Sequence, residues 1–324
     1  MEFNNKSVLV VGMARSGVAA AKALCKRGAR VTICDKKNED ELKQAVEELK
    51  TFAVTICAGY YPAVARDNFE LLVASPGVPL DIEPFLKANE QGIEIIGELE
   101  LAYMIKADSV DIFAVTGTNG KTTTVSLLKD ILSAAGKNVQ AAGNIGIPLS
   151  LVSDNMQEGI IATEVSSFQL ETIKNFHPHI SGILNITPDH LDRHHNMETY
   201  IENKAKILQN QNENDFAILN YEDPVIRNFK AQCRAAVIYF STDRVLEEGI
   251  FVENNLIKAV MPQGSWEICT LQELSLRGKH NLQNILCAVA MALAAGIPSQ
   301  AIAHTLRTFP GVRHRMEEAA FKNG

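Results

Sequence analysis

A glycine-rich run that contains a lysine, residues 116–124, constrains the fold of this chain more than any other stretch. It follows an apolar segment at 112–115 that is typical of a β-strand, and it leads into a segment with helical periodicity over 121–135. Glycines allow successive backbone N–H groups to point at one anion, Lys121 adds positive charge, and the Thr122 hydroxyl can ligate Mg²⁺. The run therefore predicts a strand, a phosphate-binding loop and a helix.

This loop departs from the strict P-loop pattern at one position. That pattern places its first glycine five residues before Gly120, where this chain has Val115. An ordinary glycine-rich turn between a strand and a helix is the alternative. The lysine and the threonines directly after Gly120 favour phosphate binding, because they supply the charge and the hydroxyl groups that a nucleotide phosphate and its Mg²⁺ require.

Length and composition describe a globular protein of about two domains. Apolar residues make up 46% of the 324 residues and charged residues 21%. The net charge of −7 gives no overall positive field that would attract nucleic acid or an anionic membrane. No apolar stretch approaches the roughly 18 residues of a membrane span, and the N-terminus has no signal-peptide pattern. We expect a cytoplasmic protein that holds anionic ligands through loop amides and helix ends.

The six cysteines are scattered and form no C-x-x-C pair. Most lie among apolar residues, as Cys34 and Cys287 do. This pattern predicts reduced thiols in the core, and it does not favour a zinc site.

The alternation of short apolar runs with helical patterns predicts an α/β fold with buried parallel sheets. Strands are expected at 8–11, 31–34, 71–74, 112–116, 138–142, 160–163 and 180–185, and helices at 17–21, 39–49, 121–135 and 281–295. We place a Rossmann-like domain at 1–108 and a P-loop-type ATPase domain at 109–311, and we interpret 312–324 as the start of a further domain. Residues 236–274 are less regular, and we interpret them as an antiparallel insertion.

The first strand-to-helix turn, residues 12–17, nearly matches the dinucleotide-binding fingerprint, with Asp35 about 20 residues further on. The middle glycine of that fingerprint is Ala14 here, although glycine at this place lets the backbone approach a pyrophosphate closely. Three interpretations remain open: an NAD site, a tight turn without a ligand, and a site for a different nucleotide.

Three polar positions follow the phosphate loop. Glu164 comes at the end of a predicted strand, where it can hold Mg²⁺ or cap a helix. His190 follows the next predicted strand. It forms an i, i+4 pair with His194, but this pair has no third zinc ligand nearby in the sequence. We therefore expect the later histidines to lie at the surface. Lys204 lies on a predicted helix whose lysines, taken alone, would form a solvated face.

Several of these strings together resemble the Mur ligase family of ATP-dependent, amide-forming enzymes of peptidoglycan synthesis. Residues 164–170 are the most discriminating string, and they resemble the branch of the family that adds D-glutamate. The strings that carry the resemblance, in the family's order, are 117–123, 143–146, 164–170, 189–193, 280–284 and 314–315.

The resemblance implies that the first domain binds the uridine diphosphate part of the substrate rather than NAD. It implies that the second domain binds ATP. The implied substrate-binding residues are Ala14, Arg15, Ser16, Asp35, Lys36, Gly77, Asn144 and Ser166. The implied ATP-binding residues are Gly117, Thr118, Asn119, Gly120, Lys121, Thr122, Thr123, Asn281, Asn284 and Arg315.

The resemblance also implies two Mg²⁺ ions. One would be held by Thr122 and Glu164, and the second by His190 and a carbamylated Lys204. Carbamylation replaces an ammonium group, which would repel the metal, by an anionic ligand. The implied catalytic residues are Lys121, Glu164, His190 and Lys204.

The implied reaction joins D-glutamate to UDP-N-acetylmuramoyl-L-alanine through an acyl phosphate, in a monomeric enzyme. Members of the family continue into a third α/β domain that holds the incoming amino acid, whereas this sequence stops shortly after Arg315. We therefore expect a fragment that keeps the uridine nucleotide site and part of the ATP site but has little activity alone. The alternatives are a sister ligase for another amino acid, a non-catalytic nucleotide-binding module and an NAD oxidoreductase.

Overall fold

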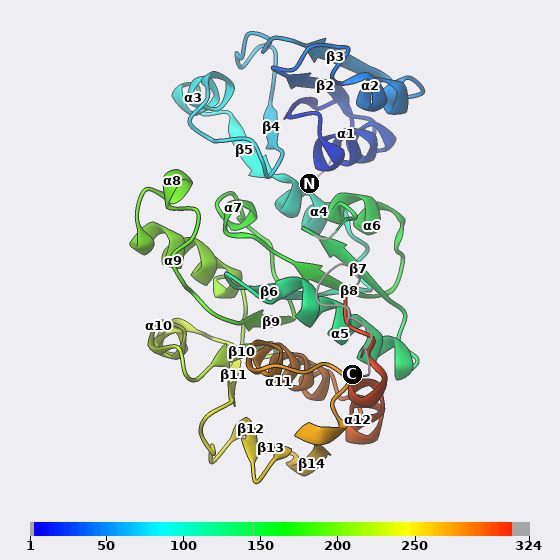
Figure 1. The fold of residues 1–324 in the computed structure, drawn as a ribbon. Coiled ribbons are helices and arrows are strands. Elements are labelled where there is room, and N and C mark those ends of the chain that lie inside the picture. Colours follow the sequence, from blue (N-terminus) through cyan, green and yellow to red (C-terminus); the bar gives the residue numbers. More distant parts are fainter. Residues whose placement is uncertain (1–2, 145, 313–324) are drawn as a thin grey trace, which may run out of the picture.

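The computed structural model describes residues 3–144 and 146–312, which form two units stacked end to end (Figure 1). The N-terminal unit is built on a five-stranded parallel sheet in the order β3-β2-β1-β4-β5. Apolar clusters lie on both faces of this sheet, which is why its strands are continuous apolar runs. Its elements are β1 (Ser7–Val11), α1 (Arg15–Lys26), β2 (Arg30–Asp35), α2 (Lys43–Leu49), β3 (Val54–Ala58), β4 (Leu71–Ala74), α3 (Glu83–Glu90) and β5 (Glu94–Gly97).

The strand order of this sheet reverses between β1 and β4, the place where open α/β sheets bind ligands. The turn after β1 and the loop after β4 approach each other closely at this point. Gly12 has φ +101°, and a Cβ there would lie 2.7 Å from Val78 Cγ2. The Ser75 hydroxyl donates to the Gly12 carbonyl at 3.0 Å. Glycine is therefore required at position 12 for both backbone conformation and space.

The central unit is built on a nine-stranded sheet in the order β14-β13-β12-β11-β10-β9-β6-β8-β7. Strands β6 to β11 run parallel, and β13 pairs antiparallel with both β12 and β14. Its strands are β6 (Val110–Thr116), β7 (Val139–Gly143), β8 (Gly159–Glu164), β9 (Ile180–Ile183), β10 (Phe216–Asn220), β11 (Ala236–Ser241), β12 (Gly249–Glu253), β13 (Leu256–Met261) and β14 (Gly264–Thr270).

Helices cover the two faces of the central sheet. On one face, α5 and α11 pack against each other over the larger core cluster, and residues 284–292 of α11 are all buried. The helices of this unit and the one that leads into it are α4 (Glu98–Ile105), α5 (Lys121–Ala134), α6 (Leu149–Asn155), α7 (Ser167–Leu170), α8 (Leu191–His194), α9 (Met197–Ala205), η1 (Lys206–Leu208), α10 (Pro224–Asn228), η2 (Phe229–Gln232), η3 (Leu271–Glu273), α11 (Lys279–Ala294) and α12 (Ser299–Thr308).

Two expectations about secondary structure are wrong in part. The region 236–274 is not wholly antiparallel, because β11 extends the parallel sheet beside β10, and β12 pairs parallel with β11 at two positions. The helix expected over 39–49 begins only at Lys43. The Asn38 and Glu41 side chains accept each other's backbone N–H groups, which favours a turn over a helix.

Helix α4 joins the two units and belongs to both cores. Leu101 and Ile105 pack in the N-terminal unit, whereas Leu99 and Ala102 pack in the central unit. A buried carboxylate, Glu98, accepts the Ser150 N–H at 2.7 Å, and its burial raises the pKa of this carboxyl group.

A second buried carboxylate of α4, Glu100, accepts the backbone N–H groups of Lys174, Asn175 and Phe176 at 2.8 to 3.0 Å. It also accepts the Asn175 side-chain amide at 3.0 Å. The helix is therefore fastened to the central unit by charged hydrogen bonds as well as by apolar packing.

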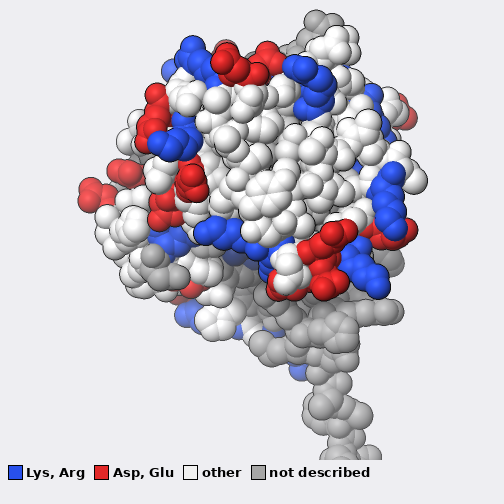
Figure 2. Space-filling view, turned by 90° about the horizontal axis from the view of Figure 1, so that it is seen from above, with Lys and Arg blue, Asp and Glu red and all other residues white. Residues whose placement is uncertain are grey.

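Charged side chains are mixed on one face of the N-terminal unit, and the cysteines carry free thiols. On the face of the N-terminal unit in Figure 2, basic and acidic residues mix around an uncharged centre. All six cysteines are free thiols, and Cys34, Cys57, Cys269 and Cys287 are buried. Within 3–144 and 146–312, no helix combines the length and hydrophobicity that crossing a bilayer requires.

We predict that Glu100→Gln lowers the free energy of unfolding by about 3 kcal/mol, because the new amide presents a donor to backbone N–H groups that need an acceptor. Urea denaturation measures this loss. Glu90→Gln is the matched control, since Glu90 is exposed and pairs with exposed Lys87 on α3. Equal stability of the two variants would contradict the role given to Glu100.

Candidate functional site

The loop between β6 and α5 has the conformation of an anion-binding turn. Gly117 and Gly120 have φ of +155° and +89°. A Cβ on Gly120 would lie 2.0 Å from Asn284 Oδ1, so the loop and the first turns of α11 fit together only with glycine at this place. Lys121 Nζ folds back and donates to the Gly117 and Thr118 carbonyls at 2.9 Å each. The loop and the lysine thus meet at the N-terminus of a 14-residue helix, where backbone N–H groups favour an anion.

The neighbouring strand β9 supports this loop. Asn185, just after β9, accepts the Asn119 N–H through Oδ1 at 2.8 Å and donates from Nδ2 to the Asn119 carbonyl at 3.1 Å. Its own carbonyl accepts the Thr118 N–H at 2.9 Å. The sequence analysis missed Asn185 as a site residue. The available signal was its position at the end of a predicted strand, but that strand's place beside β6 could not be inferred from order along the chain.

Glu164 lies beside the first turn of α5. Its carboxylate accepts the Thr122 hydroxyl at 2.8 Å and the Asn144 amide at 3.0 Å. The helix-capping alternative for Glu164 is wrong, because α7 is capped by Ser166 and Gln169 in a reciprocal capping box. A hydroxyl and a carboxylate oxygen in contact are the hard ligands that Mg²⁺ prefers, and they can hold this ion.

Lys204 is buried under the phosphate loop, so the interpretation of its helix as a solvated face is wrong at this residue. The side chain is 1% exposed, its Nζ donates to the Gly117 carbonyl at 2.9 Å, and it lies 4.7 Å from the centre of the Tyr200 ring. Burial and the charge of Lys121 lower the pKa of Lys204 to about 7, although the carboxylates of Asp189 and Glu164 act in the opposite direction. A substantial fraction of this amine is therefore neutral near physiological pH.

Tyr200 on the same helix is a second residue that the sequence analysis missed. Its hydroxyl lies 3.1 Å from Thr118 Oγ1 in the phosphate loop, and its ring is buried. Thr123, predicted to bind ATP, is buried as well, at 8% exposure. Helix α9 therefore forms one wall of the site, with Tyr200 and Lys204 one turn apart.

The histidines of the 190–195 segment differ in burial. His190 is exposed, has a left-handed backbone (φ +53°), and lies beside Asp189 at 3.5 Å. His194 is 1% exposed, with its Nε2 at 2.9 Å from Ser167 Oγ, so the expectation of a surface position is wrong for this residue. Its burial follows from stacking on the Phe168 ring at 5.0 Å.

In the N-terminal unit, the predicted substrate residues lie around the turn after β1. Both Asp35 carboxylate oxygens accept backbone N–H groups, from Met13 at 2.8 Å and Lys37 at 3.0 Å. Arg15 donates to the Gly146 carbonyl of the central unit. Ala14, Arg15, Asp35 and Gly146 line one groove of about 490 Å³, whereas Gly77 lies in the loop after β4 with open space where a side chain would be.

The remaining residues predicted to bind the substrate or ATP make fewer contacts. Ser16 is half-buried in the first turn of α1, and the Lys36 amine lies 5.4 Å from the Tyr61 ring. Asn281 donates to the Arg277 carbonyl at 2.7 Å and accepts from Asn284 at 3.4 Å. Arg315 lies outside the described residues.

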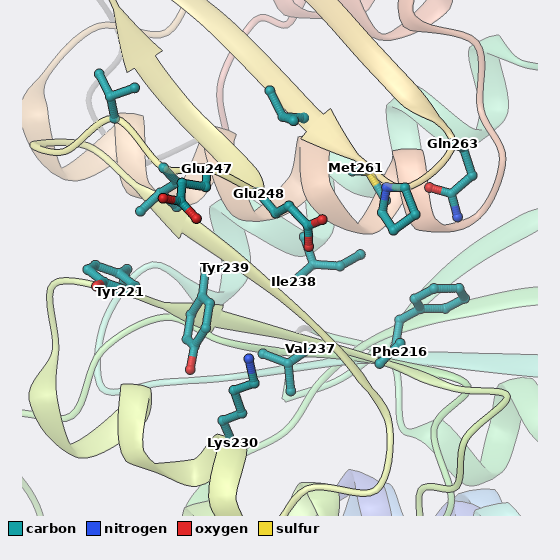
Figure 3. Close-up of a pocket in the computed structure, with 16 residues that line it drawn as sticks. Phe216, Tyr221, Lys230, Val237, Ile238, Tyr239, Glu247, Glu248, Met261 and Gln263 are labelled. Atoms are coloured by element: carbon teal, nitrogen blue, oxygen red, sulfur yellow. The ribbon is translucent and has the colours of Figure 1, made fainter.

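A separate cavity of about 680 Å³ lies at the amino ends of β10 and β11 (Figure 3). Val237 and Tyr239 of β11 line it together with Glu247 and Glu248, which precede β12. It forms because β12 pairs with β11 only at Phe240 and Ser241. None of the predicted site residues that the structure describes lines this cavity.

Comparison with known proteins gives the family. The profile of the Mur ligase middle domain matches residues 115–292, which is more than half of the chain. The chain belongs to the Mur ligase family. The profile of the MurD-like N-terminal domain of Mur ligases matches residues 6–97.

Curated Mur ligases align with nearly the whole chain. A UDP-N-acetylmuramoylalanine--D-glutamate ligase of Pelotomaculum thermopropionicum is 45% identical over 324 residues, which are 100% of this chain and 71% of the relative. The ligase of the same name from Clostridioides difficile is 42% identical over 319 residues, 98% of this chain and 70% of the relative.

Solved structures of Mur ligases share the fold at lower identity. The UDP-N-acetylmuramate:L-alanyl-gamma-D-glutamyl-meso-diaminopimelate ligase of Neisseria meningitides superposes with a TM-score of 0.65 at 18% identity, covering 95% of this chain and 99% of that one. A UDP-N-acetylmuramate-alanine ligase of Thermotoga maritima superposes with a TM-score of 0.54 at 22% identity, covering 94% and 69%. These two likenesses concern the fold alone.

We predict that Gly120→Ala destabilises the protein by at least about 2 kcal/mol, because the new methyl group adds a clash with Asn284 to the backbone strain. Gly136→Ala is the matched control, since Gly136 has φ +79° but nothing within 4 Å of an added Cβ. Its expected loss is about 1 kcal/mol from strain alone. Thermal unfolding of both variants measures the difference, and equal losses would contradict the packing of α11 on the loop.

Proposed function

We propose that this chain belongs to an enzyme that adds D-glutamate to UDP-N-acetylmuramoyl-L-alanine, using ATP, in cytoplasmic peptidoglycan synthesis. The observation that carries this proposal is the convergence of Lys121, Thr122, Glu164 and Lys204 around one glycine loop. The names of the 41% to 45% identical relatives agree with it.

We further propose domains at 1–108 and 109–311, with a further domain beginning at 312–324.

In this proposal ATP lies on the phosphate loop. The N–H groups at the N-terminus of α5, from Gly120 to Thr123, and the Lys121 amine would bind its β- and γ-phosphates, while Gly117, Thr118 and Asn119 would shape the loop around them. Asn281 and Asn284 would contact the adenosine part, because both lie in the first turns of α11 and Asn284 lies against Gly120. Arg315 would reach the γ-phosphate.

The oxygen ligands around Glu164 fit Mg²⁺. Thr122 and Glu164 are in contact at 2.8 Å and would hold one ion, and His190 with a carbamylated Lys204 would hold a second. When bound, Mg²⁺ neutralises phosphate charge and reduces its repulsion of the substrate carboxylate. The chain's own contribution is to keep these ligands together, since Asn144 donates to the second Glu164 oxygen.

Carbamylation of Lys204 is supported by the surroundings of its amine. Only a neutral amine adds CO₂, and the burial that lowers the pKa of Lys204 to about 7 supplies this form. The product is an anion close to Lys121, whose positive charge opposed the ammonium form and favours the carbamate.

The uridine diphosphate part of the substrate would lie in the N-terminal unit, bordered by Ala14, Arg15, Ser16, Asp35, Lys36 and Gly77. Asn144 and Ser166 would contact the sugar part near the phosphate loop. An NAD oxidoreductase is disfavoured because both Asp35 oxygens already accept backbone N–H groups of the turn, which leaves the carboxylate less available for a ribose.

The proposed reaction has two steps. The L-alanyl carboxylate attacks the γ-phosphorus of ATP, which forms an acyl phosphate and releases ADP. The D-glutamate amine then attacks the acyl carbon, and phosphate leaves from a tetrahedral intermediate. Lys121 and the loop amides stabilise the charge that develops on the transferred group, so the protein contributes positioning and electrostatics rather than a covalent step.

Calorimetric titration tests this proposal directly, and it measures binding rather than turnover. We predict that UDP-N-acetylmuramoyl-L-alanine binds saturably and that NADH, the control, does not. Lys121→Ala should weaken binding of an ATP analogue at least about tenfold, because a charged phosphate contact is lost. The same variant should leave affinity for the uridine nucleotide within about twofold, since Lys121 lies in the other unit. Binding of NADH alone would overturn the assignment.

We also predict that wild-type protein takes up ¹³C-labelled CO₂ at Lys204, with a carbamate signal that grows as the pH rises through about 7, because the amine is protonated below this pH. NMR detects the signal, and Lys204→Ala should lack it. Acetate or formate should partly restore metal binding to Lys204→Ala by replacing the carbamate. Absence of both the signal and any rescue would exclude the modification.

A further inference from the structure

Arg193, at the end of α8, reaches from the central unit to the N-terminal unit. Its guanidinium donates to the Pro76 carbonyl at 3.1 Å and to the Val78 carbonyl at 3.2 Å, and its side chain is 18% exposed. Both carbonyls belong to the loop after β4. One cationic group thus makes two hydrogen bonds between the units, and the planar guanidinium suits this geometry because it carries several donors in one plane.

The central unit holds the same guanidinium from the opposite side. Arg193 Cζ lies 4.1 Å from the centre of the Phe168 ring, and Nη2 lies 3.3 Å from a Glu171 carboxylate oxygen. Phe168 belongs to α7, which begins three residues after Glu164. The direction in which Arg193 points is therefore fixed by residues adjacent to the proposed ATP site.

The Phe168 ring that contacts Arg193 also packs against two histidines. His190 and His194 each lie 5.0 Å from its centre. His194 in turn contacts Asn203, the neighbour of Lys204, at 3.3 Å. Arg193 is therefore packed into the same group of side chains that presents His190 and Lys204.

On its other side, the 75–78 loop forms part of the proposed uridine nucleotide site. The Ser75 hydroxyl donates to the Gly12 carbonyl, and Val78 Cγ2 lies 2.7 Å from where a Cβ on Gly12 would be. A shift of this loop would therefore move the turn on which the diphosphate would rest. The two sites are joined through Arg193 by direct contacts.

We propose that Arg193 is a positioning residue that fixes the position of the uridine nucleotide site relative to the ATP site. The inference rests on the proposed function. Reacting groups that are carried by two units must be aligned closely, since a misplacement of about 1 Å can lower a rate about a hundredfold. Arg193 is well placed to fix this alignment because it contacts both units close to the two sites.

Loss of Arg193 should not separate the units. On the α1 side of the interface, Asp154 of α6 pairs with Lys26 at 2.6 Å and with Arg27. Helix α4 is packed in both cores. The Arg193 variants are therefore expected to fold, with a changed loop position.

The test measures the binding of two ligands together in the full chain. The affinity for UDP-N-acetylmuramoyl-L-alanine is determined with and without a non-hydrolysable ATP analogue and Mg²⁺. In the wild type, we expect one ligand to change the affinity for the other at least about fivefold. In Arg193→Ala this factor should fall below about twofold, while the affinity for the ATP analogue alone stays within about threefold. Arg193→Lys should be intermediate, because lysine cannot reproduce the planar set of donors.

Arg66→Ala is the matched control. Arg66 also donates to two backbone carbonyls, those of Gln91 and Gly92, but entirely within the N-terminal unit. It should leave the coupling between the two ligands unchanged. Absence of coupling in the wild type, full coupling in Arg193→Ala, or an equal loss in Arg66→Ala would each overturn the proposal.

Hydrogen exchange separates this inference from the proposed function, because it needs no ligand. Arg193→Ala should raise amide exchange in both 75–80 and 190–195, whereas Arg66→Ala should raise it only near 91–93. If neither nucleotide binds the wild type, the proposed function fails, and exchange alone decides the positioning role. Faster exchange confined to 190–195 would overturn that role.

Discussion

The glycine loop between β6 and α5 is the constraint on which the rest of the central unit depends. The loop closes only with left-handed or otherwise unusual backbone at Gly117 and Gly120, and three other elements fill the space around it. Asn185 supports it from β9, Asn284 from α11, and Lys204 from α9. Asn185 and Lys204 donate to backbone atoms of the loop, and Asn284 occupies the space beside Gly120, so the identities of these side chains are tied to the shape of the loop.

The same crowding produces the electrostatic character of the site. Lys121 and Lys204 share the Gly117 carbonyl, so two amines lie close together in a region with little water. Burial and this proximity disfavour the ammonium form of Lys204, while the carboxylates of Glu164 and Asp189 limit the effect. A site that is formed to hold phosphate thereby acquires an amine of lowered basicity, a substantial fraction of which is uncharged near neutral pH.

Much of the local architecture was predictable from sequence. Strands such as β1 and β4 are unbroken apolar runs, and the loop at 116–121 carries its own signal of glycines and lysine. The family resemblance was confirmed by the matches to the N-terminal and middle domain profiles. Local patterns succeed here because these features depend on the residues within each segment.

Features that depend on distant residues were not predictable in this way. The place of β9 beside β6, with β8 on the other side, is decided by tertiary packing, and so the support from Asn185 was missed. The sequence predicted Lys204 and His194 to be surface residues. Nothing adjacent in the sequence indicates that the phosphate loop covers Lys204 or that the Phe168 ring covers His194. Parallel pairing of β11 was missed because the chain between β11 and β12 is irregular.

The sharing of α4 between two cores has a consequence for the order of folding during synthesis. The apolar cluster of the N-terminal unit lacks Leu101 and Ile105 until the helix has left the ribosome, and the helix itself has no partner for Glu100 until residues 174–176 are made. The buried carboxylate must stay hydrated until then, since its desolvation without the three amides is unfavourable. The first unit therefore reaches its final packing only after half of the chain has been translated.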